Sequence, residues 1–186
     1  SSILVTEAAE SVRHLNERAR AERIQSGLTS ARREVTLRDE ACASAGDVII
    51  TRRNARRLRT SPGTWVRNGD RWTVTHVGRD GTLRVRRAGD GARVTLPAEY
   101  VARHVDLGYA VTAHRAQGMT ADTAHVVVSP STTRENLYVS MTRGRHANTA
   151  YVALDTPDPL HATPPDADTT ARTVLFGVLH HCGLEL

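Results

Sequence analysis

The chain has 186 residues, a formal net charge of +5 and 39% hydrophobic residues, which predicts one soluble domain or two small interleaved ones. No run approaches the roughly eighteen apolar residues of a membrane span, and the N-terminal stretch lacks a signal pattern, so we expect a cytoplasmic protein without membrane contact. Cys42 and Cys182 are too few and too far apart for a disulfide framework or a cysteine-rich metal site.

All 25 basic residues are arginine, because the sequence contains no lysine. This excludes a complete P-loop ATPase, whose Gly-x-x-x-x-Gly-Lys-Ser/Thr loop places a lysine against the phosphates. Lysine Schiff-base chemistry and a Ser-x-x-Lys nucleophile are excluded for the same reason.

Positive charge is concentrated in one stretch. Twelve arginines lie between Arg52 and Arg93 against three aspartates, so this stretch carries +9 and the rest of the chain carries −4. Both tryptophans, Trp65 and Trp72, lie in it as well. Because guanidinium groups hold phosphates and indole rings stack on bases, the combination favours binding of single-stranded nucleic acid. Alternatively, the arginines solvate exposed strand faces and the tryptophans fill a small core.

In chain order, the first predicted elements are a strand and a helix. The apolar run at residues 3–6 predicts a short strand, and Thr6 is placed to cap the helix that follows. The apolar residues that share one face of this helix are Val12, Leu15, Ala19 and Ile24.

The middle of the chain predicts only strands. The segments rich in β-branched residues are 47–51, 71–77, 82–87 and 92–96. Tight-turn signals separate the last three and precede the first of them, at Asn68-Gly69, Asp80-Gly81 and Asp90-Gly91, and Pro97 ends the series. Short strands joined in this way predict a small β-barrel.

The last part of the chain returns to alternating strands and helices. The predicted strands are 108–112, 124–129 and 149–154, with a helix at 132–142. Valine-rich strands that alternate with helices are typical of a buried parallel sheet. The predicted fold class is therefore α/β, with the barrel inserted into a domain whose strands come from both ends of the chain. Residues 156–168 predict a linker before a final helix at 170–182.

Two segments carry the most specific signal. They are residues 109–118, Tyr-Ala-Val-Thr-Ala-His-Arg-Ala-Gln-Gly, and residues 135–145, Glu-Asn-Leu-Tyr-Val-Ser-Met-Thr-Arg-Gly-Arg. In order and spacing they resemble motifs V and VI of superfamily 1 DNA helicases of the RecD type. The pattern is most similar to the helicase part of MobF-type conjugative relaxases, the TraA, TraI and TrwC group. Residues 46–48, the turn at 68–70 and residues 96–100 resemble the SH3-like barrel inserted in the second motor lobe of RecD-like enzymes.

The resemblance implies a RecA-like motor lobe, with a parallel sheet, that carries an inserted SH3-like β-barrel. The implied divisions are residues 1–40 for the first part of the lobe, 41–103 for the barrel, 104–156 for the second part with motifs V and VI, and 157–186 for a linker and C-terminal helix.

The same resemblance assigns a nucleotide site. Arg143 is the implied arginine finger, since a guanidinium is always charged, planar and forked, as a γ-phosphate requires. Gln117 is the second implied catalytic residue, whose amide senses the phosphate beside the bare backbone of Gly118. The implied nucleotide-binding residues are Gln117, Gly118, Thr142, Arg143 and Arg145, the last being the nearest rival for the finger.

The expected DNA contacts lie in two places. By resemblance, Thr112 and His114 of motif V face the DNA strand. The expected contacts in the barrel are Arg52, Arg53, Asn54, Arg56, Arg57, Trp65 and Trp72. Strand alternation places Trp72 on one face with Val74 and His76, which leaves open that it belongs to the core; Trp65 is the tryptophan expected to be exposed.

The implied function is that of the second motor lobe of an ATP-dependent DNA helicase or conjugative relaxase. ATP and Mg²⁺ would be shared with a missing N-terminal motor lobe that supplies the phosphate loop, and a relaxase domain is a further possible part of the same polypeptide. We expect single-stranded DNA as a partner and no ATP hydrolysis by this chain alone. Two alternatives stay open: a non-catalytic single-stranded nucleic-acid-binding module, and a scaffold whose arginine-rich face binds an acidic protein.

A metal site is not predicted. His180-His181-Cys182 invites a zinc interpretation, but adjacent helical residues point in different directions and no fourth ligand is suitably spaced.

Overall fold

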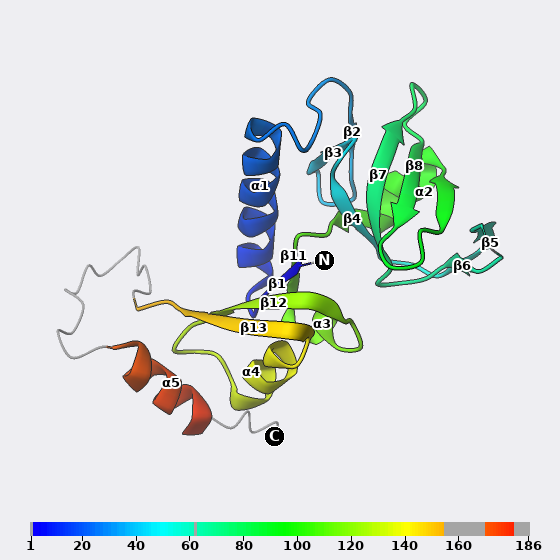
Figure 1. Cartoon of the computed structure of the whole chain (residues 1–186). Helices are drawn as coiled ribbons and strands as arrows, with labels where there is room; N and C mark the ends of the chain where they lie inside the picture. The colour runs from blue at the N-terminus through cyan, green and yellow to red at the C-terminus, as the bar shows by residue number, and fades with distance from the viewer. Residues whose placement is uncertain (1, 62, 155–169, 181–186) are drawn as a thin grey trace. The chain divides into compact units, whose positions relative to one another are not determined.

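The computed structural model describes residues 2–61, 63–154 and 170–180, which fall into two compact units (Figure 1). The sheet unit combines Ser1–Val12 with Val111–Leu186, and the barrel unit is Arg13–Ala110. The barrel unit therefore interrupts the sheet unit in sequence. This arrangement confirms the predicted α/β fold with an inserted barrel.

The sheet unit is built on four strands. In spatial order they are β11 (Ala110–Thr112), β1 (Ser2–Thr6), β12 (Ala121–Val128) and β13 (Gly144–Val152). β12 runs parallel to both β1 and β13. Alternate residues of the two inner strands are buried, because successive side chains of a strand point to opposite faces of the sheet. These buried residues are Ile3, Val5, Ala124, Val126 and Val128.

Three short helices complete the sheet unit. They are α3 (Ala113–Ala116), α4 (Arg134–Met141) and α5 (Ala171–His180). α4 packs on β12 and β13 and also contacts α3 and α5. Thr112 and Thr133 cap α3 and α4, since each hydroxyl accepts a backbone N–H of the first turn at 3.3 Å.

The barrel unit is centred on a five-stranded antiparallel sheet. In spatial order its strands are β10 (Val105–Leu107), β4 (Val48–Thr51), β7 (Arg71–Val77), β8 (Leu83–Arg87) and β9 (Arg93–Leu96). Two smaller antiparallel pairs are β2 (Glu34–Thr36) with β3 (Cys42–Ser44), and β5 (Ala55–Arg59) with β6 (Trp65–Val66). Helix α2 (Ala98–His104) follows β9. The core between these elements includes Ile49, Trp72, Leu83 and Leu96, all fully buried.

A fully buried carboxylate, Asp47, ties helix α1 (Ala9–Gln25) to the barrel. Asp47 accepts hydrogen bonds from Ser44 N at 2.7 Å, Arg20 Nε at 2.9 Å and the Tyr109 hydroxyl at 2.6 Å. Asn16 of α1 accepts from the backbone N–H groups of Tyr109 and Ala110. These bonds fix Tyr109 and Ala110, the first two residues of the motif V segment.

The structure corrects several predicted boundaries. Thr6 is the last residue of β1 and is buried there, so it does not cap α1, which begins at Ala9. The predicted strand at 108–112 is shorter, because Gly108 lies against the backbone of Ile49 and only Ala110–Thr112 joins the sheet. The predicted linker at 156–168 lies outside the described residues.

The predicted barrel turns are present. Gly69, Gly81 and Gly91 adopt positive φ angles, as tight hairpin turns require. Among the described residues, none of the helices combines the length and apolar character needed to cross a bilayer.

Candidate nucleotide edge and nucleic-acid groove

The motif V and motif VI segments meet at the edge of the sheet where β12 and β13 begin. Met119 lies two residues after Gln117 and just before β12, and Arg143 directly precedes β13. Arg143 Nη1 donates to the Met119 carbonyl at 3.5 Å, and the Arg143 carbonyl accepts from Ala121 N at 3.0 Å. We call this place the nucleotide edge; its residues are 117–119 and 142–145. The structure thus brings Arg143 to the turn that follows Gln117.

The Arg143 side chain is half-buried and incompletely satisfied. Its Nη2 donates to the Thr142 hydroxyl at 2.7 Å, and that hydroxyl donates in turn to the carbonyls of the preceding α4 turn. Its Nε is buried and has no hydrogen-bond partner in the part of the chain that the structure describes. A buried donor without an acceptor costs about 1–3 kcal/mol. The position of this guanidinium therefore carries a cost that would be removed if the side chain moved to an acceptor outside.

The other predicted nucleotide residues are open to solvent. Gln117, Gly118, Thr142 and Arg145 are all exposed. Gly118 has a φ of +79°, a left-handed conformation that glycine adopts without a side-chain penalty. Of the predicted DNA contacts in this unit, His114 is exposed and Thr112 is half-buried at the start of α3.

The second candidate site is a groove in the barrel unit with a volume of about 590 Å³, between β5 and α2. We call it the barrel groove. Four of the predicted DNA-binding residues line it, namely Arg53, Asn54, Arg56 and Arg57. Leu58, Tyr100, Arg103 and His104 line it as well and were not predicted from the sequence. The sequence does contain a signal for the helix that carries two of these residues. Pro97 favours a helix start, and the i, i+4 spacing of Tyr100 and His104 places both side chains on one helix face.

The aromatic side of the barrel groove is held in place by its own contacts. The Tyr100 hydroxyl donates to the Arg53 carbonyl, and the Tyr100 and His104 rings lie edge to face at 5.3 Å. Arg53 Nη1 lies 3.3 Å from His104 Nε2, which is the acceptor because a guanidinium has only donors. Burial raises the pKa of Tyr100, so the phenol stays protonated near neutral pH.

The two tryptophans have different environments. Trp65 is half-buried, and the guanidinium carbons of Arg56 and Arg67 lie 5.6 and 5.3 Å from its ring centroid. Trp72 has none of its surface exposed and belongs to the barrel core with Val74. The prediction that Trp72 stacks on a base is therefore wrong, because the inner face of β7 buries it.

Arg52 is also not available as predicted. Its side chain is 13% exposed, and its Nε lies 2.6 Å from the Asp106 carboxylate. Arg38 binds the same carboxylate with two nitrogens, at 2.8 and 2.9 Å. Burial alone would raise the pKa of Asp106, but the hydrogen bonds from Arg38 and Arg52 outweigh it and hold that pKa below its usual value. Arg52 belongs to a structural ion pair, which corrects its assignment to DNA.

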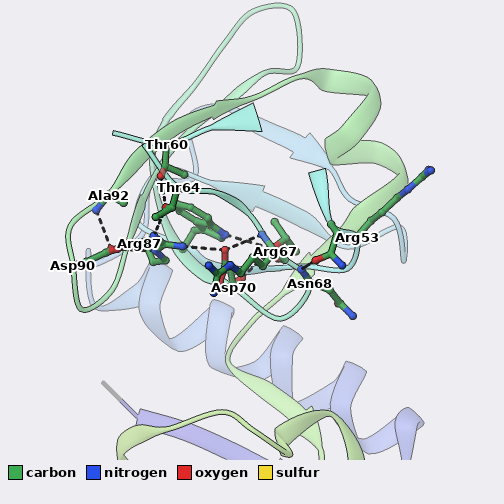
Figure 2. Close-up of polar contacts among 12 residues, drawn as sticks. Arg53, Thr60, Thr64, Arg67, Asn68, Asp70, Arg87, Asp90 and Ala92 are labelled. Atoms are coloured by element: carbon green, nitrogen blue, oxygen red, sulfur yellow. Dashed lines mark hydrogen bonds and ion pairs between the residues drawn. The ribbon is translucent and has the colours of Figure 1, made fainter. Parts of the chain in front are cut away.

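A polar network centred on Arg87 contacts the residue that precedes β6, Thr64 (Figure 2). Arg87 binds Asp70 at 3.1 Å, Asp90 at 2.7 Å and the Thr64 hydroxyl at 3.0 Å. The hydrogen bond from Arg87 lowers the pKa of Asp90. Figure 2 shows these partners converging on the Arg87 guanidinium from three separate loops. Arg87 is therefore another arginine of the basic stretch that serves the fold.

The described residues contain no cluster of three or more His, Cys, Asp or Glu side chains that could hold a metal ion. His180 ends α5, whereas His181 and Cys182 lie outside the described residues.

The barrel matches a known family of domains. Residues 35–106 match the family described as the Rv2311 SH3-like barrel domain. The uncharacterized protein Rv2311 of Mycobacterium tuberculosis (strain H37Rv) is 46% identical over 88 residues, which are 47% of this chain and 51% of that protein. The chain thus spans about half the length of this relative.

Conjugal transfer proteins match a larger part of the chain. TraA of Rhizobium radiobacter is 30% identical over 72% of this chain and 12% of its own length. The probable TraA of Sinorhizobium fredii is 29% identical over 78% of this chain and 13% of its own length. The chain therefore corresponds to about one eighth of these relatives.

Solved helicase structures share the fold. The Pif1 helicase from Bacteroides in complex with ADP-AlF3 and single-stranded DNA has a TM-score of 0.58 and 17% identity, over 84% of this chain and 41% of that one. Bacteroides Pif1 bound to single-stranded DNA has a TM-score of 0.55 and 16% identity, over 81% of this chain and 40% of that one. The chain is thus similar to part of the conjugal transfer TraA proteins and has the fold of a helicase-like lobe with an SH3-like barrel inserted.

Proposed function

We propose that this chain is the second motor lobe of an ATP-dependent DNA helicase or conjugative relaxase, and that Arg143 is its arginine finger. The observation that carries the proposal is the position of Arg143, half-buried at the turn after Gln117 with its Nε unpartnered among the described residues. A first motor lobe would supply the phosphate loop, since this sequence has no lysine for one.

The residues of the nucleotide edge fit an anionic ligand. When bound, ATP with Mg²⁺ supplies the γ-phosphoryl group that is transferred to water. Arg143 would leave its 3.5 Å contact with Met119 and place its fork on the phosphate oxygens. Gln117, Gly118 and Arg145 are exposed at the same edge and would contact the nucleotide beside it.

The comparisons support the ligand classes in this proposal. The similar Pif1 structure has both ADP-AlF3 and single-stranded DNA bound, and the TraA relatives are named for conjugal transfer. Thr112 and His114, at the start of α3, are the proposed DNA contacts of the sheet unit. Because α3 leads directly into the nucleotide edge, one segment would touch both ligands and couple them.

The test is DNA-stimulated ATP hydrolysis by a polypeptide that joins this chain to its first motor lobe. We expect Arg143→Ala to lower the rate about a thousandfold or more, as loss of an arginine finger does. Arg143→Lys would restore little, because an ammonium lacks the planar fork. Arg145→Ala measures the rival finger and should cost far less than Arg143→Ala.

Two results would contradict the proposal. One is an Arg143→Ala variant that hydrolyses ATP at the wild-type rate. The other is DNA-stimulated hydrolysis by the present chain alone, since the proposal assigns the phosphate loop to another lobe.

The second candidate function is a non-catalytic module that binds single-stranded nucleic acid. The arginine-lined barrel groove favours it, because this site needs no nucleotide. A preceding polypeptide without a Gly-x-x-x-x-Gly-Lys-Ser/Thr loop would favour this candidate over the motor lobe.

A further inference from the structure

We propose that the barrel groove is a binding site for single-stranded DNA in which an unpaired base lies on Tyr100 and Leu58 while the arginines of β5 and its flanking loop hold the backbone phosphates. The choice of DNA as the ligand rests on the proposed function. The site itself lies wholly within the barrel unit and does not involve the nucleotide edge.

The groove has the size and lining of a ligand site. Its volume of about 590 Å³ falls within the roughly 300–1,000 Å³ of small-molecule pockets, enough for a nucleotide. Leu58, Pro97 and Tyr100 give it an apolar surface. A purely electrostatic phosphate site would not need that surface, whereas a base would bury against it.

The charge of the groove suits a polyanion. Arg53, Arg56 and Arg57 are exposed along one side. The one carboxylate in the lining, Glu99, lies 3.1 Å from Arg103 and is thereby neutralised. The surplus positive charge is therefore carried by β5 and the residues just before it, where it can attract the phosphates of a nucleic-acid strand.

The aromatic platform is preorganised. The hydroxyl of Tyr100 donates to the Arg53 carbonyl, and the half-buried ring packs against the barrel core while it also lines the groove, so the ligand meets the ring rather than a polar group. The edge-to-face contact with His104 fixes the ring orientation. A ring held before binding loses little side-chain entropy when a base stacks on it. Trp65 is less suited, since two arginines already lie against its ring.

These features favour single-stranded DNA over an acidic peptide or a duplex. An acidic peptide would contact the arginines but would leave the apolar surface of Tyr100 and Leu58 exposed to water. A base in a duplex is paired and stacked, so it cannot reach the platform without unstacking at a cost of a few kcal/mol.

The test is binding of a fluorescent oligo(dT) to the full chain without nucleotide, measured by anisotropy. Tyr100→Ala should weaken binding about tenfold, the effect of losing one stacked base, whereas Tyr100→Phe keeps the ring and should stay close to wild type. Arg57→Glu should weaken binding at least as much. Arg84→Glu is the matched control, because Arg84 is exposed on β8 outside the groove and carries the same change of charge. Circular dichroism confirms that each variant is folded.

Three outcomes would overturn the inference. Equal losses for Arg57→Glu and Arg84→Glu would show diffuse charge attraction, and unchanged binding by folded Tyr100→Ala would remove the platform. Displacement of the oligonucleotide by poly-glutamate at similar concentration would identify an acidic-peptide site instead. The binding assay contains no nucleotide, so a negative result in it does not bear on the proposed role of Arg143. In the same way, a negative ATPase result for Arg143→Ala does not bear on DNA binding in the barrel groove.

Discussion

Gly144 shows how one residue without a side chain sets the position of the proposed finger. It follows Arg143 at the start of β13, and a Cβ there would lie 2.1 Å from the Ala147 carbonyl oxygen and 2.8 Å from Ala124 N. Both are backbone atoms that cannot move aside easily. The close approach of β13 to β12, and with it the placement of Arg143, therefore requires glycine at this position.

Gly144→Ala should lower the free energy of unfolding by about 3 kcal/mol, because the added methyl group would clash with the backbone of β13 itself at Ala147 and with the backbone of β12 at Ala124. Urea denaturation measures the change. Gly177→Ala in α5 is the matched control, since a Cβ there meets nothing within 4 Å. It should be neutral or stabilise by about 0.5–1 kcal/mol through helix propensity. Equal stability of the two variants would contradict the steric argument.

Tyr109 gives a pH-dependent test at the same scale. Burial, together with the hydrogen bond to Asp47, raises the pKa of Tyr109 to about 12. The folded state therefore keeps this proton above pH 10, where the unfolded state releases it. Stability from this group is complete below pH 10 and is lost as the pH rises through about 12. Wild type should lose about 2 kcal/mol more than Tyr109→Phe across this window in urea denaturation. Parallel pH profiles of the two proteins would refute the assignment.

At the scale of elements, strand β10 is the connection between distant parts of the barrel. Asp106 in its centre is only 4% exposed and binds Arg38, from the turn between β2 and β3, and Arg52, which follows β4. β10 also pairs antiparallel with β4. One carboxylate thus holds a hairpin, the end of a central strand and an edge strand together.

Asp106→Asn should destabilise the chain by about 3 kcal/mol, because it removes the carboxylate charge that the mostly buried guanidinium of Arg52 contacts. Thermal or urea unfolding measures this loss. Arg13→Ala removes an exposed ion pair on α1 and should change the free energy of unfolding by less than about 0.5 kcal/mol. A small effect of Asp106→Asn, similar to that of Arg13→Ala, would show that the buried pairs contribute no more than surface pairs.

The whole molecule carries its charge unevenly, and the structure reduces how much of it a partner can use. The stretch from Arg52 to Arg93 holds +9, but Arg52, Arg71 and Arg87 are committed to Asp106, the Gly108 carbonyl and the Asp70–Asp90 pair. Arg71 is half-buried, and burial lowers its pKa. The arginines available to a polyanion are those of the barrel groove and the outer strand faces.

The affinity of the whole chain for oligo(dT) should therefore fall steeply with salt. Phosphate contacts by the three groove arginines that have no carboxylate beside them in the lining give a slope of log affinity against log salt of about −2, or about a twentyfold loss between roughly 50 and 200 mM salt. Anisotropy titrations across this range measure the slope. A slope near zero would mean that the arginines do not contact phosphates, and a slope several times steeper would place the contacts beyond the groove.

Much of this architecture could be predicted from the sequence. Strand periods and turn glycines located the core strands of the barrel, and the valine-rich segments located β12. The β5–β6 ribbon was missed because Ala-Arg-Arg-Leu-Arg has no apolar alternation, although Ala55 and Leu58 pack against the barrel core. The platform residue Tyr100 was missed because α2 has only seven residues, and its partner Arg53 lies 47 positions away. Burial also removes Arg52 and Trp72 from the set of predicted DNA contacts, whereas Arg53 and Trp65 keep exposed surface. Residue type alone does not make this distinction.

The insertion of the barrel between β1 and β11 has a consequence for the order of folding. β1 is synthesised before the barrel, whereas its sheet neighbours β11 and β12 are synthesised only after it. Closing the intervening loop while it is disordered would cost more entropy than closing it once the barrel has brought its own ends together. We therefore expect the barrel to fold during translation, before β11 and β12 are available to pair with β1.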